Sequence, residues 1–414
     1  MKEHRFQFKD VAAIEGSPNW DALIARPSVL YEREGDIRTP FARDYTRILH
    51  SQAYRRLKHK TQVFFNIDND HICTRMEHVA HVESVATTIA HSLGLNEELT
   101  RAIATGHDLG HAPFGHHGEN VLSKLCEEHL NRRFWHERNG LRLVDKVELL
   151  KDYYNRDKNL DLTYAVRDGI ISHCGEIDCN GLKPRKELID LEAEFLKKGQ
   201  YQPATWEGCV VKLADKIAYV GRDIEDAKDL GFLSQTAMNE LTRMAQMNDE
   251  KALNTTVIIY GLISDINKNS SPDKGICMSD EFFEQLKALK SFNYKYIYQN
   301  DRLVTFEKYA ELVINELFGV LFRYYDGRHS FEELSKHEVM APTLIDSFIH
   351  YASKYCDPEI VPQELVERVL LADNEKIYGR FEDKETYAHA IIDYISGMTD
   401  RFAVKAFNEM LIYD

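Results

Sequence analysis

Apolar residues along most of the chain recur every three or four positions, which is the spacing that places them on one face of an α-helix. The clearest stripe covers residues 75–93, and residues 99–106 continue it in a second helix. The segments 206–227, 304–325 and 385–413 predict three further long amphipathic helices. The chain is therefore predicted to have an all-α fold.

Strand-type alternation is scarce by comparison. Residues 61–68 (TQVFFNID) are the best candidate for a short strand or hairpin. Residues 153–202 are charged and irregular, and we interpret them as an excursion on the surface of one helical body. No repeat, glycine-serine linker or low-complexity block marks a boundary along residues 1–414, so the pattern predicts a single large helical domain.

The composition narrows the function classes. With 43% hydrophobic and 29% charged residues, the chain has ample apolar material for a core. Its 52 basic and 67 acidic residues leave a formal net charge of −15, which disfavours general nucleic-acid binding. A protein this acidic must concentrate positive charge, or a metal ion, wherever it handles an anionic substrate.

The sequence predicts a cytoplasmic protein that does not enter a membrane. No uncharged apolar run approaches the ~18 residues of a membrane span, and the N-terminal residues lack the apolar core of a signal peptide. The seven cysteines are scattered without a CxxC pair, which suits a reducing compartment. Cys174 and Cys179 have no second pair that would complete a zinc site, so we interpret them as ordinary thiols.

Residues 104–119, ATGHDLGHAPFGHHGE, concentrate four histidines, one aspartate, one glutamate and four glycines. Because His107 and Asp108 are adjacent, on a helix they point about 100° apart and reach one ion only at the helix edge. Partners must come from other helices: His78 lies within the first apolar stripe, and Asp215 lies among apolar residues of the third predicted helix. An unpaired buried carboxylate is too costly to keep, so a cation or metal is the natural partner of Asp215. Two imidazoles and two carboxylates suit manganese, iron, magnesium-like or zinc-like ions.

A single histidine on an amphipathic helix is more often a core or rim residue, and we assign His81 and His91 that way. An isolated His-Asp dipeptide also carries little information. What favours a metal centre is the order of His78, then His107 with Asp108, then Asp215, each predicted in a helix, with the glycine-rich turn directly after the pair.

Seven segments together resemble one family. The chain is similar to the HD-domain superfamily of metal-dependent phosphohydrolases and, more narrowly, to the deoxyguanosine triphosphate triphosphohydrolase family and its eukaryotic SAM-and-HD-domain relatives. The segments that follow the order and spacing of the family are HSQAYRRLKHKTQVF, TRMEHVAHV, GHDLGHAPFGHHGE, FWHERNGLRLV, GIISHCGE, VKLADKIAYVGRDIEDA and DYISGMTDRFA.

The resemblance implies an all-α HD-domain core over about residues 43–230, with helices over about 231–414 that complete the pocket and the oligomer contacts. It implies a homo-oligomer that is built from dimers and reaches up to a hexamer. It also implies control by an effector nucleotide or single-stranded DNA. It also implies a divalent metal ion, with Mn²⁺, Mg²⁺ and Fe²⁺ all open. The implied metal ligands are His78, His107, Asp108 and Asp215.

The reaction that the resemblance implies is hydrolysis of deoxynucleoside triphosphates at the α-phosphorus, which releases deoxynucleoside and inorganic tripolyphosphate. The best single substrate is dGTP. His116 and Glu119 stand at the positions of the family's catalytic histidine and acid, and three residues apart they can form a His–carboxylate pair. His111 and His136 match histidines that line the phosphate channel and are second candidates. His117 has no counterpart and receives no role.

Substrate-binding residues carry over in the same way. Arg75 and Lys216, each near a predicted ligand, match phosphate contacts. Tyr219 matches a ring that packs on the sugar, where it would exclude a 2′ hydroxyl, and Asp223 matches an acceptor for the 3′ hydroxyl.

Three further positions match the family less specifically. Gln62 and Val63 correspond to residues near the sugar and base, although a plain strand would also explain them. His173 fits the family pattern, and a structural role would explain it equally well.

Two other function classes stay open. An HD-type phosphodiesterase or guanosine tetraphosphate hydrolase would share the metal centre, but it leaves the KTQVF and GHHGE segments without a purpose. A regulator that only binds nucleotide or single-stranded nucleic acid would be expected to lack a metal ligand, whereas all four are present. The basic run from Arg55 to Lys60 is compatible with a nucleic-acid or effector contact, although such runs are more often solvated.

Overall fold

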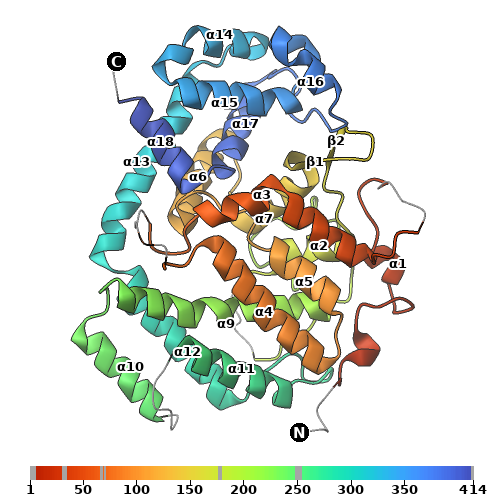
Figure 1. Ribbon diagram of the computed structural model, residues 1–414, viewed down its shortest axis with the longest axis vertical. Helices are drawn as coiled ribbons and strands as arrows, with labels where there is room; N and C mark the ends of the chain where they lie inside the picture. The colour runs from red at the N-terminus through yellow and green to blue at the C-terminus, as the bar shows by residue number, and fades with distance from the viewer. Residues whose placement is uncertain are drawn as a thin grey trace.

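The structure is a computed structural model that describes residues 6–29, 35–65, 69, 71–175, 180–247 and 254–411, and helices form most of its ordered elements (Figure 1). The first half holds α1 (Trp20–Leu23), α2 (Pro40–His50), α3 (Gln52–Arg56), α4 (Arg75–Leu93), α5 (Glu97–Gly106), α6 (Gly115–Leu130), α7 (His136–Arg142), α8 (Tyr164–Ser172) and α9 (Trp206–Asp229). The second half holds α10 (Gln235–Met247), α11 (Thr255–Asn269), α12 (Asp280–Asn293), α13 (Asp301–Arg323), α14 (Ser330–Lys336), α15 (Pro342–Ala352), α16 (Val366–Leu370), α17 (Lys384–Ser396) and α18 (Asp400–Glu409). The predicted all-α class is confirmed.

Helix α4 is the central element, and it packs against α5 and α9 (Figure 1). It begins with a capping box, in which the Thr74 side chain accepts from the Glu77 backbone N–H while Glu77 accepts from Thr74. It ends at Gly94, whose φ of 81° is easy only for glycine. The predicted apolar stripe is fully buried along Val79, Val82, Ala86, Ile89 and Leu93. These caps and this stripe fix where the first turn of α4 points.

The C-terminal helices cover the other side of the glycine-rich segment. Helices α13 and α17 both pack on α6, and α18 packs on α13 (Figure 1). Two π turns, Leu143–Val147 and Tyr294–Tyr298, extend α7 and α12. None of the helices among the described residues combines the length and the apolar run that a bilayer crossing requires. The proposed boundary between a core over residues 43–230 and the remaining helices stays a prediction.

The prediction of a strand over residues 61–68 is wrong for the part that the structure describes. Thr61 forms only an isolated bridge with Thr74, and residues 66–68 lie outside the described residues. The Thr61 N–H and hydroxyl both donate to the Asp400 carboxylate, so this segment is held by a side chain instead of a neighbouring strand. Among the described residues, the one sheet is the antiparallel pair β1 (Leu149–Lys151) and β2 (Asp157–Asn159), with Leu149 opposite Asn159.

The prediction that residues 153–202 form a surface excursion is also wrong in part, because this segment contains the buried helix α8. It packs against α5, α7 and α9 and buries most of its length. Its charged residue Asp168 is fully buried and pairs with Arg185. The charged residues of the segment therefore made an interior helix look like a surface one. The remainder, from 180 to 202, is irregular as predicted.

The prediction of one long helix over 385–413 is corrected to two helices. The break follows Ser396, and Thr399 caps the new helix by accepting from the Phe402 N–H. Asp400, directly after the break, accepts from the Phe114 N–H as well as from Thr61. A straight helix would carry this carboxylate away from both partners.

Candidate active site

Three helices bring the predicted metal ligands to one point. His78 lies in the first turn of α4 and Asp215 in the middle of α9, and His78 Nε2 is 3.1 Å from Asp215 Oδ1. His107 Nε2 lies 3.6 Å from Asp108 Oδ1 and 3.9 Å from Asp215 Oδ1. All four side chains are buried.

The expectation that His107 and Asp108 both lie within a helix is corrected, because α5 ends at Gly106. His107 is the capping residue at that end, and Asp108 follows in a turn. His107 itself keeps helical dihedrals, with φ −59° and ψ −37°. Its Nε2 lies 3.6 Å from Asp108 Oδ1, so the two side chains face one point at the end of α5.

The donor set fits a divalent cation. His107 Nδ1 donates to the Ala104 carbonyl at 2.6 Å, which leaves the lone pair on Nε2. That Nε2 is buried and has no hydrogen-bond partner among the described residues, although two carboxylates face it. Burial lowers the pKa of His107 to about 4, so the imidazole is neutral near pH 7. A buried imidazole lone pair between carboxylates is what a bound cation satisfies.

Two cations flank these carboxylates. Arg75 Nη1 lies 2.9 Å from Asp108 Oδ2, and Lys216 Nζ lies 3.3 Å from Asp215 Oδ2. Arg75 is almost fully buried, and Lys216 nearly so. Burial alone would lower the pKa of Lys216, but neighbouring Cys174 and Asp215 hold it above its usual value. Both predicted phosphate contacts therefore carry charge at the edge of the ligand set.

A second cluster, formed by His111, His116, Glu119 and His136, adjoins the first. His111 Nε2 is 3.0 Å from Asp108 Oδ1, and the rings of His111 and His136 stack with centroids 3.8 Å apart. Glu119 Oε2 lies 2.8 Å from His136 Nδ1 and 3.5 Å from His116 Nδ1. The carboxylate that we predicted to pair with His116 thus holds His136 more closely. His116 is largely exposed, whereas the other three are buried.

Close backbone approaches explain the glycines of this segment. A Cβ on Gly110 would lie 2.0 Å from the His136 carbonyl oxygen and 2.2 Å from the Gly140 nitrogen. A Cβ on Gly118 would lie 1.8 Å from the Pro113 oxygen. The absence of side chains therefore lets the turn touch the start of α7, which is what stacks His111 on His136.

Lys60 was not singled out from the sequence, yet it fixes this turn from behind. Its fully buried ammonium donates to the carbonyls of His111 and Ser396. Burial lowers the pKa of Lys60 to about 7. Its place two residues before Gln62, inside a segment that matched the family, was the available signal.

Farther along α9, Tyr219 is half-buried and Asp223 is buried. The Tyr298 hydroxyl donates to Asp223, while burial raises the pKa of Asp223 to about 7. The Lys216 ammonium lies 6.0 Å from the centroid of the Tyr219 ring. Tyr298 was missed, because no motif marks a residue 75 positions away.

Gln62 and Val63 are half-buried near the Arg75 end of the site. A Cβ on Gly115 would lie 3.5 Å from the Gln62 carbonyl oxygen and 3.2 Å from Arg75 Nη2, which places the Gln62 backbone beside the arginine. Val63 packs against the hydrophobic core. His117, which received no role, lies 3.0 Å from Glu307.

Comparison with known proteins agrees with this geometry. The HD domain family model matches residues 75–220, and the phosphohydrolase-associated domain model matches residues 276–341 and 351–409. A deoxyguanosinetriphosphate triphosphohydrolase-like protein of Caldanaerobacter subterraneus is 34% identical over 382 residues, which cover 92% of this chain and 87% of the relative. The chain belongs to this HD-domain family.

Two further relatives carry the same description. The protein of Clostridium tetani is 34% identical over 335 residues, covering 80% of this chain and 85% of its own. That of Bartonella tribocorum is 29% identical over 425 residues, covering 98% and 96%. Membership of the family identifies the chain as a phosphohydrolase, and HD domains bind divalent metals. The HD match runs from three residues before His78 to five beyond Asp215, so it contains the whole ligand set.

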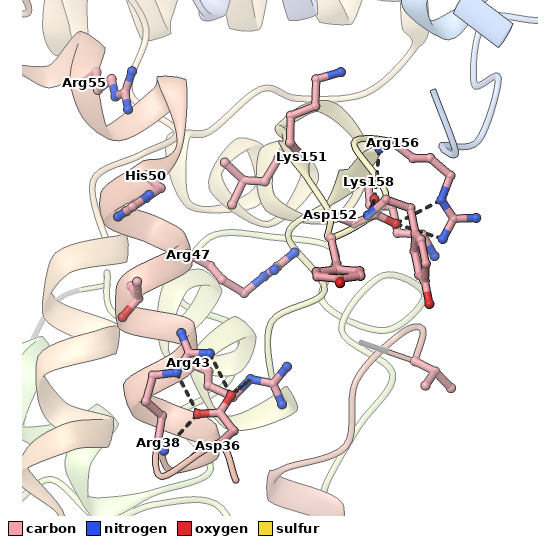
Figure 2. A pocket seen from close by; sticks show the side chains of 15 residues that line it. Asp36, Arg38, Arg43, Arg47, His50, Arg55, Lys151, Asp152, Arg156 and Lys158 are labelled. Carbon is pink, nitrogen blue, oxygen red and sulfur yellow. Dashed lines mark hydrogen bonds and ion pairs between the residues drawn. The ribbon is translucent and has the colours of Figure 1, made fainter. Parts of the chain in front are cut away.

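A basic cavity of about 700 Å³ lies apart from these residues, between α2 and the β1–β2 hairpin (Figure 2). Arg43, Arg47 and Arg55 line it from the α2–α3 side, and Lys151 and Lys158 from the hairpin. Including Arg38 and Arg156, seven basic residues face two aspartates, Asp36 and Asp152. In a chain of net charge −15, basic residues therefore outnumber acidic ones in this cavity.

Proposed function

We propose that the protein hydrolyses deoxynucleoside triphosphates to deoxynucleoside and inorganic tripolyphosphate, with dGTP as the preferred substrate. The observation that carries the proposal is the position of His107. Its unpartnered Nε2 faces two carboxylates that Arg75 and Lys216 flank, with the histidine cluster directly alongside. Phosphoryl chemistry needs these elements together: positive charge on phosphate oxygens, an acidified water and a group that moves a proton.

The divalent ion, Mn²⁺, Mg²⁺ or Fe²⁺, is proposed to bind His78, His107, Asp108 and Asp215. When bound, it supplies charge for the phosphate oxygens and acidifies water. Arg75 and Lys216 are proposed to hold the phosphate oxygens. Their present partners are carboxylates of the ligand set, so each cation already lies within reach of the same point.

Proton handling is assigned to the cluster around Glu119. Although burial opposes it, the neighbouring Glu137 and Glu119 hold the pKa of His136 well above its usual value. His136 is therefore proposed to contact a phosphate oxygen. His116 is exposed and 3.5 Å from Glu119, so we propose that it exchanges the proton of the 5′ oxygen while Glu119 orients it. His111, stacked on His136 and bonded to Asp108, is proposed to position the phosphate chain.

Tyr219 and Asp223 are proposed to select deoxyribose, with Gln62 and Val63 near the sugar and base. On α9 the half-buried Tyr219 and the buried Asp223 lie beyond Lys216, in the order phosphate then sugar. The Tyr219 ring against C2′ would leave no room for a 2′ hydroxyl. The buried Asp223 would accept a hydrogen bond from the 3′ hydroxyl.

The test is an incubation with each of the four dNTPs and with GTP, singly and mixed, with Mn²⁺ or Mg²⁺, followed by ion-exchange separation of products. We expect tripolyphosphate from dGTP and little from GTP. Nucleoside monophosphate with pyrophosphate would refute the proposed bond. Activity towards cyclic or 3′-phosphorylated nucleotides, with none towards dNTPs, would favour the HD-type phosphodiesterase alternative.

We propose in addition a cytoplasmic homo-oligomer, dimer-based and up to a hexamer, controlled by an anionic effector. The basic cavity supports an effector nucleotide or single-stranded DNA, because its cations exceed its carboxylates (Figure 2). Light scattering of the purified protein, with and without dNTPs, tests the assembly. A monomer that is fully active would refute it.

A further inference from the structure

Cys174 lies between two histidines that the N/O ligand set does not use. His136 Nε2 is 3.6 Å from Cys174 Sγ, and the His173 side chain also interacts with this thiol. The ligand atoms of the three residues lie within 4.8 Å of one another, and all three are buried. They come from the start of α7 and the end of α8, which pack against each other.

Both imidazoles are oriented from behind in the manner of metal ligands. His136 Nδ1 is bonded to the Glu119 carboxylate at 2.8 Å, and His173 Nδ1 to the Ile170 carbonyl at 2.7 Å. With each Nδ1 engaged by an acceptor, Nε2 is the nitrogen that each ring leaves for a metal ion, which displaces any proton held there. For His136 this nitrogen faces the Cys174 sulfur. Carboxylate or carbonyl support of this kind fixes the ring and strengthens the nitrogen as a ligand.

The spacing also fits a small tetrahedral ion. Zn–S bonds of about 2.3 Å and Zn–N bonds of about 2.0–2.1 Å at a tetrahedral angle separate sulfur and nitrogen by about 3.6 Å. The separation of Cys174 Sγ from His136 Nε2 is 3.6 Å. A neutral hydrogen bond tolerates this distance but gives no reason for a second imidazole on the same sulfur.

Charged groups of both signs lie around Cys174. The Lys216 ammonium favours the thiolate form of Cys174. Thiolates, unlike thiols, are metal ligands. Glu137, beside His136, is buried, and neither of its carboxylate oxygens accepts a hydrogen bond from any described residue. Glu137 Oε2 lies 3.4 Å from His136 Nδ1 and Glu137 Oε1 lies 3.6 Å from Lys198 Nζ, so a second carboxyl group adjoins the cluster.

We propose that His136, His173 and Cys174 form a second metal site, which takes a thiophilic divalent cation such as Zn²⁺. The site is distinct in ligand chemistry from the N/O set, although the His173 ring lies only 5.0 Å from the His107 ring. Because His136 is also the proposed phosphate contact, Zn²⁺ on its Nε2 withdraws it from substrate. Zn²⁺ bound at this site therefore inhibits hydrolysis. The inhibition rests on the proposed function, but the binding of the ion does not.

Cobalt substitution separates the two sites. A thiolate ligand gives Co²⁺ an intense near-ultraviolet charge-transfer band, which nitrogen and oxygen ligands do not give. We expect this band when the metal-free protein is titrated with Co²⁺. It should disappear in Cys174→Ser and persist in Cys126→Ser, a buried cysteine outside the cluster.

The wild-type titration needs no variant to fold, and absence of the band there overturns the proposal, as does a band that survives Cys174→Ser. The band should also persist in Asp215→Ala, which lacks the N/O centre, so the two proposals fail separately. With Mn²⁺ enzyme turning over dGTP, Cys174→Ser should raise the Zn²⁺ concentration for half-inhibition by more than about tenfold. Equal Zn²⁺ sensitivity of the two proteins would refute the inhibitory role.

Discussion

The two halves of the candidate site are built by different means. In the N/O set, His78 and Asp215 lie on the long helices α4 and α9. His107 caps the end of α5, and Asp108 follows in a turn. In the histidine cluster, only His111 lies in the turn, whose shape depends on glycines and on the close approach of α7. His116 and Glu119 lie at the start of α6, and His136 begins α7. The first half contains only buried groups, and the second contains the exposed His116.

This difference separates two chemical tasks. A rigid, fully buried set of fixed charges suits holding an ion, because the carboxylates keep one protonation state. Asp215, next to Lys216, has a pKa well below its usual value despite burial. The cluster instead joins an exposed histidine to a shared carboxylate, which suits a proton that arrives and leaves. The predictions at Asp215, His116 and Gly110 each act on one half, and the prediction at Asp223 concerns the neighbouring sugar end of α9.

The largest effect is expected for Asp215→Ala. It removes a ligand from the N/O set. The purified variant should therefore lose both bound metal and activity, while its circular dichroism stays nearly unchanged. Elemental analysis and a dGTP assay measure this. Asp229→Ala, exposed on the same helix, is the matched control and should keep both. A metal-loaded Asp215→Ala protein would show that Asp215 is not a ligand.

His116→Ala acts on the histidine cluster and should leave the metal in place. We expect kcat for dGTP to fall by about 10²–10⁴-fold, the usual contribution of a general acid or base. His91→Ala, an exposed histidine on α4, is the control. A loss below about tenfold would move the proton-handling role to His111 or His136. Loss of metal would mean that the two halves are not separable.

The pH dependence of stability should reveal Asp223. Burial raises its pKa to about 7 from 3.8, so the folded protein binds a proton that the unfolded chain releases near pH 4. The stabilising effect of that proton is complete below pH 4 and is lost as the pH rises through 7, by up to about 4 kcal/mol. Denaturant unfolding from pH 4.5 to 7.5 should therefore show wild type losing stability relative to Asp223→Asn. Parallel curves would contradict a neutral Asp223; Asp229→Asn is the control.

Gly110→Ala should have the smallest effect, about 1–3 kcal/mol of unfolding free energy, because the new methyl must displace the His136 carbonyl. The displacement separates His111 from His136 and should lower kcat more than metal content. In Gly319→Ala, no atom lies within 4 Å of the added carbon, and stability should hold or rise slightly. An unaltered Gly110→Ala protein would show that close approach does not shape the turn.

The sequence predicts the ligands on long helices better than it predicts contacts between distant segments. Helix periodicity located α4 and α9, hence His78 and Asp215, because one face of each must be buried. Periodicity could not reveal α8 as an interior helix, since Asp168 looked like a surface charge until Arg185 was placed against it.

Contacts across the fold left no periodic trace either. Cys174 meets His136 across 38 residues, and Tyr298 meets Asp223 across 75. A search for paired cysteines passes over the first, because its partners are histidines. The firmer pairing of Glu119 with His136 than with His116 likewise depends on where α7 packs.

Hydrolysis of dGTP in H₂¹⁸O tests the central claim most directly, because it asks whether both halves act on the α-phosphorus. The predicted result is tripolyphosphate that carries one ¹⁸O and deoxyguanosine that carries none, as water attacks phosphorus and the 5′ oxygen leaves. Labelled deoxyguanosine would show cleavage at carbon, and dGMP with pyrophosphate would show cleavage of a different bond. Either result would contradict the proposed roles of His116 and the metal centre.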